Sequence, residues 1–169
     1  MEATVKCPSC GHNSLRLSDY LYDMPLVGKV ILTVGKCDKC GYKFNDVRLA
    51  EQKPPRRLKV LVESEKDLNI IVVRCSTATI RVPELGLELI PGPASEGFIT
   101  TIEGVLRRFL DVLETLCKDA EPKLLAECTR RRRELEEALK GNKRFTLIIE
   151  DPEGGSAILS DKAVEEPLT

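Results

Sequence analysis

The pattern of apolar and polar positions is simplest in the middle of the chain. Between residues 58 and 90, four short stretches are β-branched or alternate strictly, and turn residues separate them. This pattern predicts four strands, at 58–62, 70–74, 79–82 and 87–90. Short strands at such spacing are typical of an antiparallel β-sandwich or barrel.

A helical period follows. Thr100 and Glu103 stand at the spacing of a capping box, so we expect Thr100 as the N-cap and Glu103 reaching back to it. Two apolar stripes of helical period come next, with a reversal of the chain between them. They predict a helical hairpin at about 100–141, inserted into the β-domain. Strands resume at 145–150 and 157–159.

A change of composition marks the joint between two modules. Residues 52–57 read Gln-Lys-Pro-Pro-Arg-Arg, and two prolines among charged residues neither continue a strand nor a helix. We therefore predict a first domain at 1–52 and a β-domain at 58–160. The tail at 161–169 is expected to be loose.

The first domain carries four cysteines in two Cys-x-x-Cys pairs, each followed by glycine. Each pair lets one tight turn aim two sulfurs at a single point, and 26 residues between the pairs allow the turns to face each other. Four thiolates around one point are typical of a structural zinc site. The expected ligands are Cys7, Cys10, Cys37 and Cys40.

The residues between the two pairs predict an antiparallel zinc ribbon. Residues 29–34 read as a strand that leads into the second turn. The tract at 19–26 holds more large apolar groups than a ribbon tip needs. It either packs on the neighbouring domain or forms a partner-binding surface, and the second alternative would use Tyr20, Tyr22, Met24 and Leu26.

Charge and cysteine count limit the setting. The formal net charge of −1 argues against a protein whose main task is to hold nucleic acid by its phosphates. No apolar run reaches the roughly 20 residues of a membrane helix, and the first knuckle leaves no room for a signal peptide. Cys75, Cys117 and Cys128 remain as expected free thiols, which favours a reducing, cytoplasmic location.

Catalytic chemistry finds little support in the sequence. His12 is the single histidine and lies beside a zinc knuckle, so a catalytic metal site built from histidines is excluded. The three further cysteines have no histidine near them in sequence, which disfavours a Cys-His nucleophile. We expect no enzyme.

The run Arg130-Arg131-Arg132-Arg133 could suggest a grip on nucleic acid. Arg130, Arg132 and Arg133 each stand four residues before a glutamate, however, where opposite charges pair on a helix. A solvated helical face is the favoured reading. The alternative function is a nucleic-acid-binding zinc ribbon of the transcription or translation machinery.

The order of motifs resembles the ZPR-type zinc-finger proteins over about residues 5–160. The Cys-Pro-x-Cys-Gly and Cys-x-x-Cys-Gly-Tyr pairs are followed by Thr-Ala-Thr-Ile at 77–80 and Pro-Glu-Leu at 83–85. Gly-x-x-Thr-Thr-x-Glu-Gly at 97–104 and Phe-Thr-Leu-Ile-Ile-x-Asp-Pro at 145–152 complete the series. Eukaryotic members hold two such modules, whereas this chain holds one and resembles the archaeal form.

The resemblance implies a fold and a function. It implies a four-cysteine zinc ribbon with one structural zinc, followed by a jelly-roll-like double-stranded β-helix with a helical hairpin. The fold class is thus mainly β with an α-hairpin. It also implies a non-catalytic interaction module that binds translation elongation factor 1 alpha, favours its GDP-bound form and assists its folding as a chaperone. Neither nucleic acid nor a membrane is an expected partner.

Overall fold

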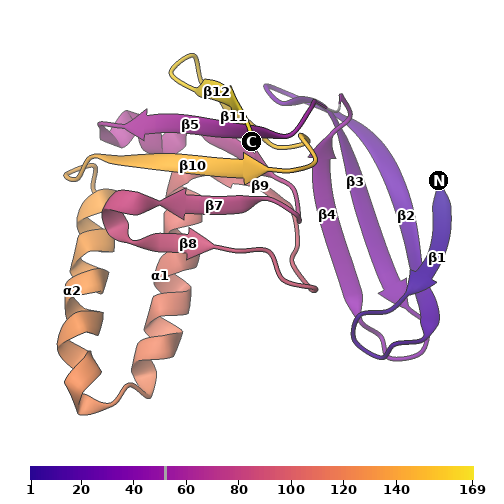
Figure 1. Ribbon diagram of the computed structural model, residues 1–169, viewed down its shortest axis with the longest axis horizontal. Coiled ribbons are helices and arrows are strands. Elements are labelled where there is room, and N and C mark those ends of the chain that lie inside the picture. Colours follow the sequence, from indigo (N-terminus) through magenta and orange to yellow (C-terminus); the bar gives the residue numbers. More distant parts are fainter. Residues whose placement is uncertain (52) are drawn as a thin grey trace.

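A computed structural model describes residues 1–51 and 53–169 and shows a ribbon module beside a β-domain that carries two helices (Figure 1). The ribbon is a four-stranded antiparallel meander in the order β1-β2-β3-β4. Its long central hairpin joins two short outer strands. The strands are β1 (Glu2–Lys6), β2 (Asn13–Met24), β3 (Gly28–Cys37) and β4 (Lys43–Leu49).

The β-domain consists of two antiparallel sheets, with strand orders β12-β5-β10-β7-β8 and β11-β6-β9. The six strands predicted for this domain are present with bounds shifted by at most two residues, and β9 and β12 are additional. The strands are β5 (Arg56–Val62), β6 (Ile71–Arg74), β7 (Thr79–Val82), β8 (Leu87–Leu89), β9 (Phe98–Thr101), β10 (Phe145–Asp151), β11 (Ala157–Leu159) and β12 (Val164–Pro167).

Alternation along the strands explains the core. Every second residue of β5 and of β10 is buried, as period-two pairing predicts for strands with one face inward. These side chains pack against the first turn of one helix and the last turns of the other. The buried set includes Leu58, Val60, Val62, Ile102, Val105, Leu106, Leu135, Ala138, Phe145, Leu147 and Ile149.

The predicted helical hairpin consists of α1 (Ile102–Lys118) and α2 (Pro122–Leu139). Both helices project from one end of the β-domain, and their free ends extend beyond the strands (Figure 1). The base of the hairpin is buried in the core, whereas apolar side chains farther out, such as Leu116 and Leu125, are exposed. None of the described helices has the length and apolarity that a membrane crossing requires.

The expected capping box is wrong in its details. Strand β9 continues through Thr101, which pairs with Ile71, so the helix starts one residue later than predicted. Thr101 is the N-cap, and its hydroxyl accepts a hydrogen bond from the Gly104 amide at 3.1 Å. Glu103 does not reach back to the N-cap but pairs with Arg107 one turn ahead, at 2.7 Å.

The expectation of three free thiols is also wrong for two of them. The reversal between the helices brings Cys117 and Cys128 to a Cα separation of 6.0 Å, and their sulfurs form a disulfide. Cys75 is a buried free thiol, and burial raises its pKa to about 12. Two of the three expected free thiols on which the inference of a reducing compartment rests are therefore joined in a disulfide.

The chain end, predicted to be loose, instead forms strand β12, which pairs with β5 at the edge of the larger sheet. Charge pairing explains the difference: the buried Arg56 guanidinium binds Glu165 at 2.8 Å and also donates to the Ser156 carbonyl. Arg56 and Arg57, which were placed in the joint, thus belong to β5. Gln52, the first residue of that joint, lies outside the described residues.

The ribbon docks on the β-domain through its upper half, which is the half that contains the β2–β3 turn. Val30 and Val47 of the ribbon form a small core with Val73 of β6, and all three are almost completely buried. Beside this core, the Asp46 carboxylate accepts hydrogen bonds from the Ser76 amide at 2.9 Å and from its hydroxyl at 2.6 Å. The knuckle end of the ribbon points away from the β-domain (Figure 1).

Candidate metal centre and interaction surface

The two cysteine pairs lie in two turns with the same backbone geometry. Gly11 and Gly41 have φ values of +72° and +75°, which glycine adopts without the strain of a side chain. Each glycine amide donates to the carbonyl of the first cysteine in its turn, at 2.9 Å for Cys7 and 3.0 Å for Cys37. The glycine after each pair is therefore what closes the knuckle.

The four thiols converge on one point. Every Sγ of Cys7, Cys10, Cys37 and Cys40 lies within 4.8 Å of the other three. The Sγ atoms of Cys7 and Cys40 are 3.7 Å apart, and so are those of Cys10 and Cys37. A tetrahedron with Zn–S bonds of about 2.3 Å has edges of about 3.8 Å. The sulfurs therefore already stand close to the spacing that a tetrahedral zinc ion requires.

The surroundings of the cluster favour the thiolate form at two of the four cysteines. The Ser14 hydroxyl lies 3.1 Å from the Cys37 sulfur, and this hydrogen bond, with the Cys40 amide, lowers the pKa of Cys37 to about 6. The backbone amide of His12 lowers the pKa of Cys10 in the same way. Metal binding needs deprotonated sulfur, so these contacts favour loading at Cys10 and Cys37. At Cys40, the Tyr42 backbone amide is outweighed by desolvation and the neighbouring thiols, which raise the pKa to about 11, so this cysteine loses its proton least readily.

The remaining polar groups near the knuckles lie on the surface. His12 is exposed, and its Nδ1 atom lies 3.0 Å from the Cys10 carbonyl oxygen rather than among the sulfurs. Lysines flank the cysteines on both knuckles and are all exposed, where they oppose the formal charge of −2 on a zinc bound to four thiolates. These lysines are Lys6, Lys36, Lys39 and Lys43.

The apolar tract between the knuckles is partly packed on the β-domain, as the first alternative predicted, and partly exposed. Met24 packs with the core shared by the ribbon and the β-domain. Tyr20 and Tyr22, each 49% exposed, lie on the same face of β2, and Leu26 is 84% exposed. One end of the tract therefore anchors the ribbon, and the rest of it faces solvent.

Leu26 has a backbone conformation that no local sequence pattern predicts. Its φ is +69°, the only positive φ among the described non-glycine residues, in a turn closed by the Val27 amide and the Met24 carbonyl. Pro25 stands at the second turn position and Leu26 at the third, which normally favours glycine. Proline was a usable turn signal, but nothing in the sequence marks this leucine as left-handed.

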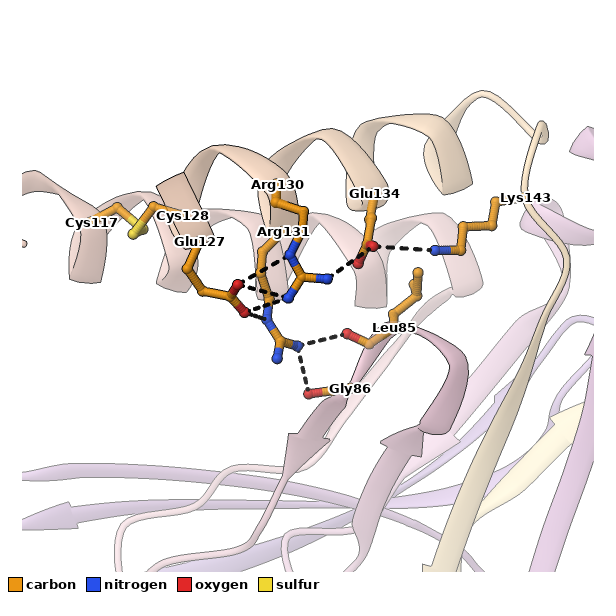
Figure 2. A network of polar contacts seen from close by, with 9 residues as sticks. All are labelled: Leu85, Gly86, Cys117, Glu127, Cys128, Arg130, Arg131, Glu134 and Lys143. Atoms are coloured by element: carbon orange, nitrogen blue, oxygen red, sulfur yellow. Dashed lines mark hydrogen bonds and ion pairs between the residues drawn. A yellow bond between two sulfur atoms is a disulfide. The ribbon is translucent and has the colours of Figure 1, made fainter. Parts of the chain in front are cut away.

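Two arginines of the run, Arg130 and Arg131, are held by contacts within the protein (Figure 2). Arg130 forms ion pairs with Glu127 at 2.7 Å and Glu134 at 3.5 Å, as the helical spacing predicted for the second. Arg131 donates to the carbonyl oxygens of Leu85 and Gly86, and so fastens α2 to the turn before β8.

Of the other two arginines, Arg132 pairs with Glu136 at 3.0 Å as predicted. Arg133 forms no ion pair within residues 1–51 and 53–169, because Lys140 and Asn142 take its expected partner Glu137. Most of this charge is therefore neutralised by neighbouring carboxylates, as a solvated helical face requires.

Comparison with known proteins covers both modules. Residues 1–55 match the ZPR1 zinc-finger domain, and residues 66–167 match the ZPR1 jelly-roll domain. The jelly-roll fold and the zinc-finger module expected from the sequence are therefore confirmed. With the four-thiol cluster, the match supports one structural zinc.

Relatives with one module and relatives of greater length both align with the chain. An uncharacterised ZPR1-like protein of Methanocaldococcus jannaschii is 40% identical over 98% of this chain and 84% of its own length. A second from Pyrococcus horikoshii is 40% identical over 96% and 75%. The zinc finger chaperone zpr1 of Schizosaccharomyces pombe is 35% identical over 86% of this chain but only 33% of its own length. The chain thus belongs to the ZPR1 family, whose zinc-finger and jelly-roll domains it carries as a single pair.

Proposed function

We propose that this protein is a non-catalytic interaction module that binds translation elongation factor 1 alpha of its own cell and assists its folding. Cys7, Cys10, Cys37 and Cys40 hold the zinc, which serves only to shape the ribbon. The family match supports a zinc-binding module that acts on proteins, and one relative is named a chaperone. The elongation factor is the partner that the family resemblance implies.

The exposed apolar side chains at and beside the β2–β3 turn, which we call the ribbon tip, carry this proposal. Tyr20, Tyr22 and Leu26 present large apolar surfaces to solvent, and aromatic side chains are enriched at the centres of protein interfaces. A leucine held at φ +69° with its side chain exposed costs stability and gains no burial within this chain. Such strain is typical of positions that serve binding rather than folding.

The metal makes this surface rigid. Strands β2 and β3 form the longest ladder of the ribbon, with its knuckle end closed by the thiol cluster and its tip end docked on the β-domain. Both ends are therefore fixed, and the tyrosines lose little conformational freedom on binding. The cytoplasmic location follows from this partner and not from the thiols.

A pull-down with the purified elongation factor in its GDP and GTP states tests the proposal. We expect binding that is stronger with GDP and at least tenfold weaker after Tyr22→Ala or Leu26→Ala. Leu116→Ala is the matched control, because it removes a leucine of similar exposure from the helical hairpin. Absence of binding in both nucleotide states would refute the proposal. Binding that the two tip variants leave unchanged would show that the interface lies outside the ribbon tip.

A further inference from the structure

A groove with an apolar wall opens on the β-domain between the β8–β9 loop and helix α1. Its volume is about 440 Å³, which suits one or two side chains of a guest. The wall is built mainly from Leu89, Phe98, Val105, Phe109 and Val112. Phe98 forms part of a neighbouring cavity as well, which includes Met24 of the ribbon.

Two arginines in this groove share the same aromatic ring. The guanidinium carbon of Arg108 lies 4.3 Å from the centre of the Phe98 ring, and that of Arg74 lies 5.6 Å from it. Both arginines line the groove. A single phenyl ring therefore holds two positive charges at the same site.

Arg74 is a buried cation that forms no direct ion pair with the described residues. It is 2% exposed, and it donates from Nε to the Ala78 carbonyl at 2.9 Å and from Nη1 to the Glu96 carbonyl at 2.8 Å. Its Nη2 has no hydrogen-bond partner, and no ion pair joins Arg74 to a carboxylate of the described residues. Asp46 and Asp151 attract this guanidinium only from beyond ion-pair distance, so its buried charge is incompletely compensated, which is costly.

Arg108 is exposed and is likewise unpaired within the described chain. The contrast with Arg107, its neighbour on α1, is instructive, since Arg107 is paired with Glu103 at 2.7 Å. Arg108 instead stands over the Phe98 ring at the edge of an apolar cavity. An exposed guanidinium beside an apolar wall offers a bidentate site for a carboxylate whose neighbouring side chain is apolar.

The other charges at the groove limit the guest to a single negative charge. Glu88 and Glu96 also line it, and Glu88 is held by Arg81 while the Glu96 side chain is exposed. Two carboxylates at the groove repel a chain of phosphates, which disfavours nucleic acid. A peptide with one acidic residue next to a large apolar residue matches both the charges and the wall.

We propose that this groove binds an acidic-apolar peptide segment of a protein partner. The carboxylate of the guest pairs with Arg108, the buried charge of Arg74 adds attraction, and the apolar residue of the guest packs against Phe98 and Phe109. This site is separate from the ribbon tip and rests on the groove alone, so it stands whether or not the partner is an elongation factor.

Amide NMR spectra of the zinc-loaded full chain test the proposal with two probe peptides, acetyl-Leu-Asp-Leu-Phe-amide and its neutral counterpart with asparagine. We expect the acidic peptide to shift the Gly97 and Phe98 amides and the Arg108 Nε signal, with an affinity at least tenfold above that of the neutral peptide. Arg108→Gln should abolish this preference. Because Arg108 is exposed, its replacement leaves the fold intact, and the spectrum reports this directly.

Arg107→Gln is the matched control, because it removes a charge that is also exposed, one residue away and outside the groove. It should leave the tenfold preference unchanged. Equal shifts by both peptides, shifts outside the groove, or no shift at millimolar peptide would overturn the proposal. Tighter binding of a single-stranded oligonucleotide that depends on Arg108 would overturn it too, in favour of nucleic acid.

Discussion

Removal of the zinc should affect the two halves of the ribbon differently. The knuckle half holds the four thiols and little else, since Leu15 is its only fully buried apolar side chain besides cysteine. The upper half docks on the β-domain through Val30 and Val47. We expect the knuckle half to unfold without metal and the upper half to remain in place.

The magnitudes support this division. The two knuckle turns, 7–11 and 37–41, together hold ten residues, and ordering their backbone costs about 10–20 kcal/mol. Burial of Leu15 returns about 2–3 kcal/mol, and a structural zinc contributes about 10–16 kcal/mol. The stabilising contributions match the cost of ordering the backbone to within a few kcal/mol only when the contribution of the zinc is included. In the upper half, each buried valine contributes about 2 kcal/mol without any metal.

Hydrogen exchange read by mass spectrometry measures both halves at once. In chelator-treated protein, or after Cys37→Ser, we expect fast exchange in the knuckles and protected amides near Val30 and Val47. Cys75→Ser is the control, because it changes a cysteine outside the cluster and should retain one zinc per chain. Exchange that stays slow in the knuckles, or that becomes fast throughout the β-domain, would refute the reasoning.

Three further perturbations are read by stability. Cys117→Ser breaks the disulfide that spans 11 residues, so it should destabilise the outer turns of the hairpin by about 3 kcal/mol, measured by local hydrogen exchange. Gly154→Ala puts a Cβ at φ +70° and 1.7 Å from a backbone carbonyl oxygen, so thermal melting should show a loss of stability of about 2–4 kcal/mol. Gly92→Ala is the control, because its Cβ meets open space, and it should leave the stability unchanged. Asp67→Asn tests a pH dependence, because pairing with Lys162 lowers the pKa of Asp67. Its stabilisation should be complete above the ordinary pKa of 3.8 and vanish as the pH falls below the lowered value, so urea melts of wild type and variant should converge in acid.

The sequence is informative wherever one local rule decides the structure. Alternation located the strands, helical period located the hairpin, and two Cys-x-x-Cys pairs with a following glycine located the thiol cluster. In each case the signal comes from residues close together on the chain, within one strand, one helix or one turn. The strand at 145–150 was found because Phe145, Leu147 and Ile149 alternate, and those three side chains are buried in the core.

Features that depend on contacts between distant residues were missed. Cys117 and Cys128 form a disulfide only because the two helices run back along each other, and no local pattern reports that distance. The loose-tail prediction failed because Glu165 finds Arg56, which lies 109 positions away. Arg74 reads as an ordinary charged end of a strand, and its burial depends on how the β8–β9 loop folds over it.

The docking of the two modules places strand β4 of the ribbon against the backbone beside the groove. Gly97 lies so close to the ribbon that a Cβ there would stand 2.1 Å from an Asp46 oxygen and 2.6 Å from the Val47 amide nitrogen. The chain beside the groove is therefore pressed against β4, at the same point where Asp46 binds Ser76. A change in the ribbon that shifts Asp46 must move Gly97 and with it Phe98, the ring that both arginines share. The zinc ribbon thus positions a binding element of the β-domain in addition to displaying its own.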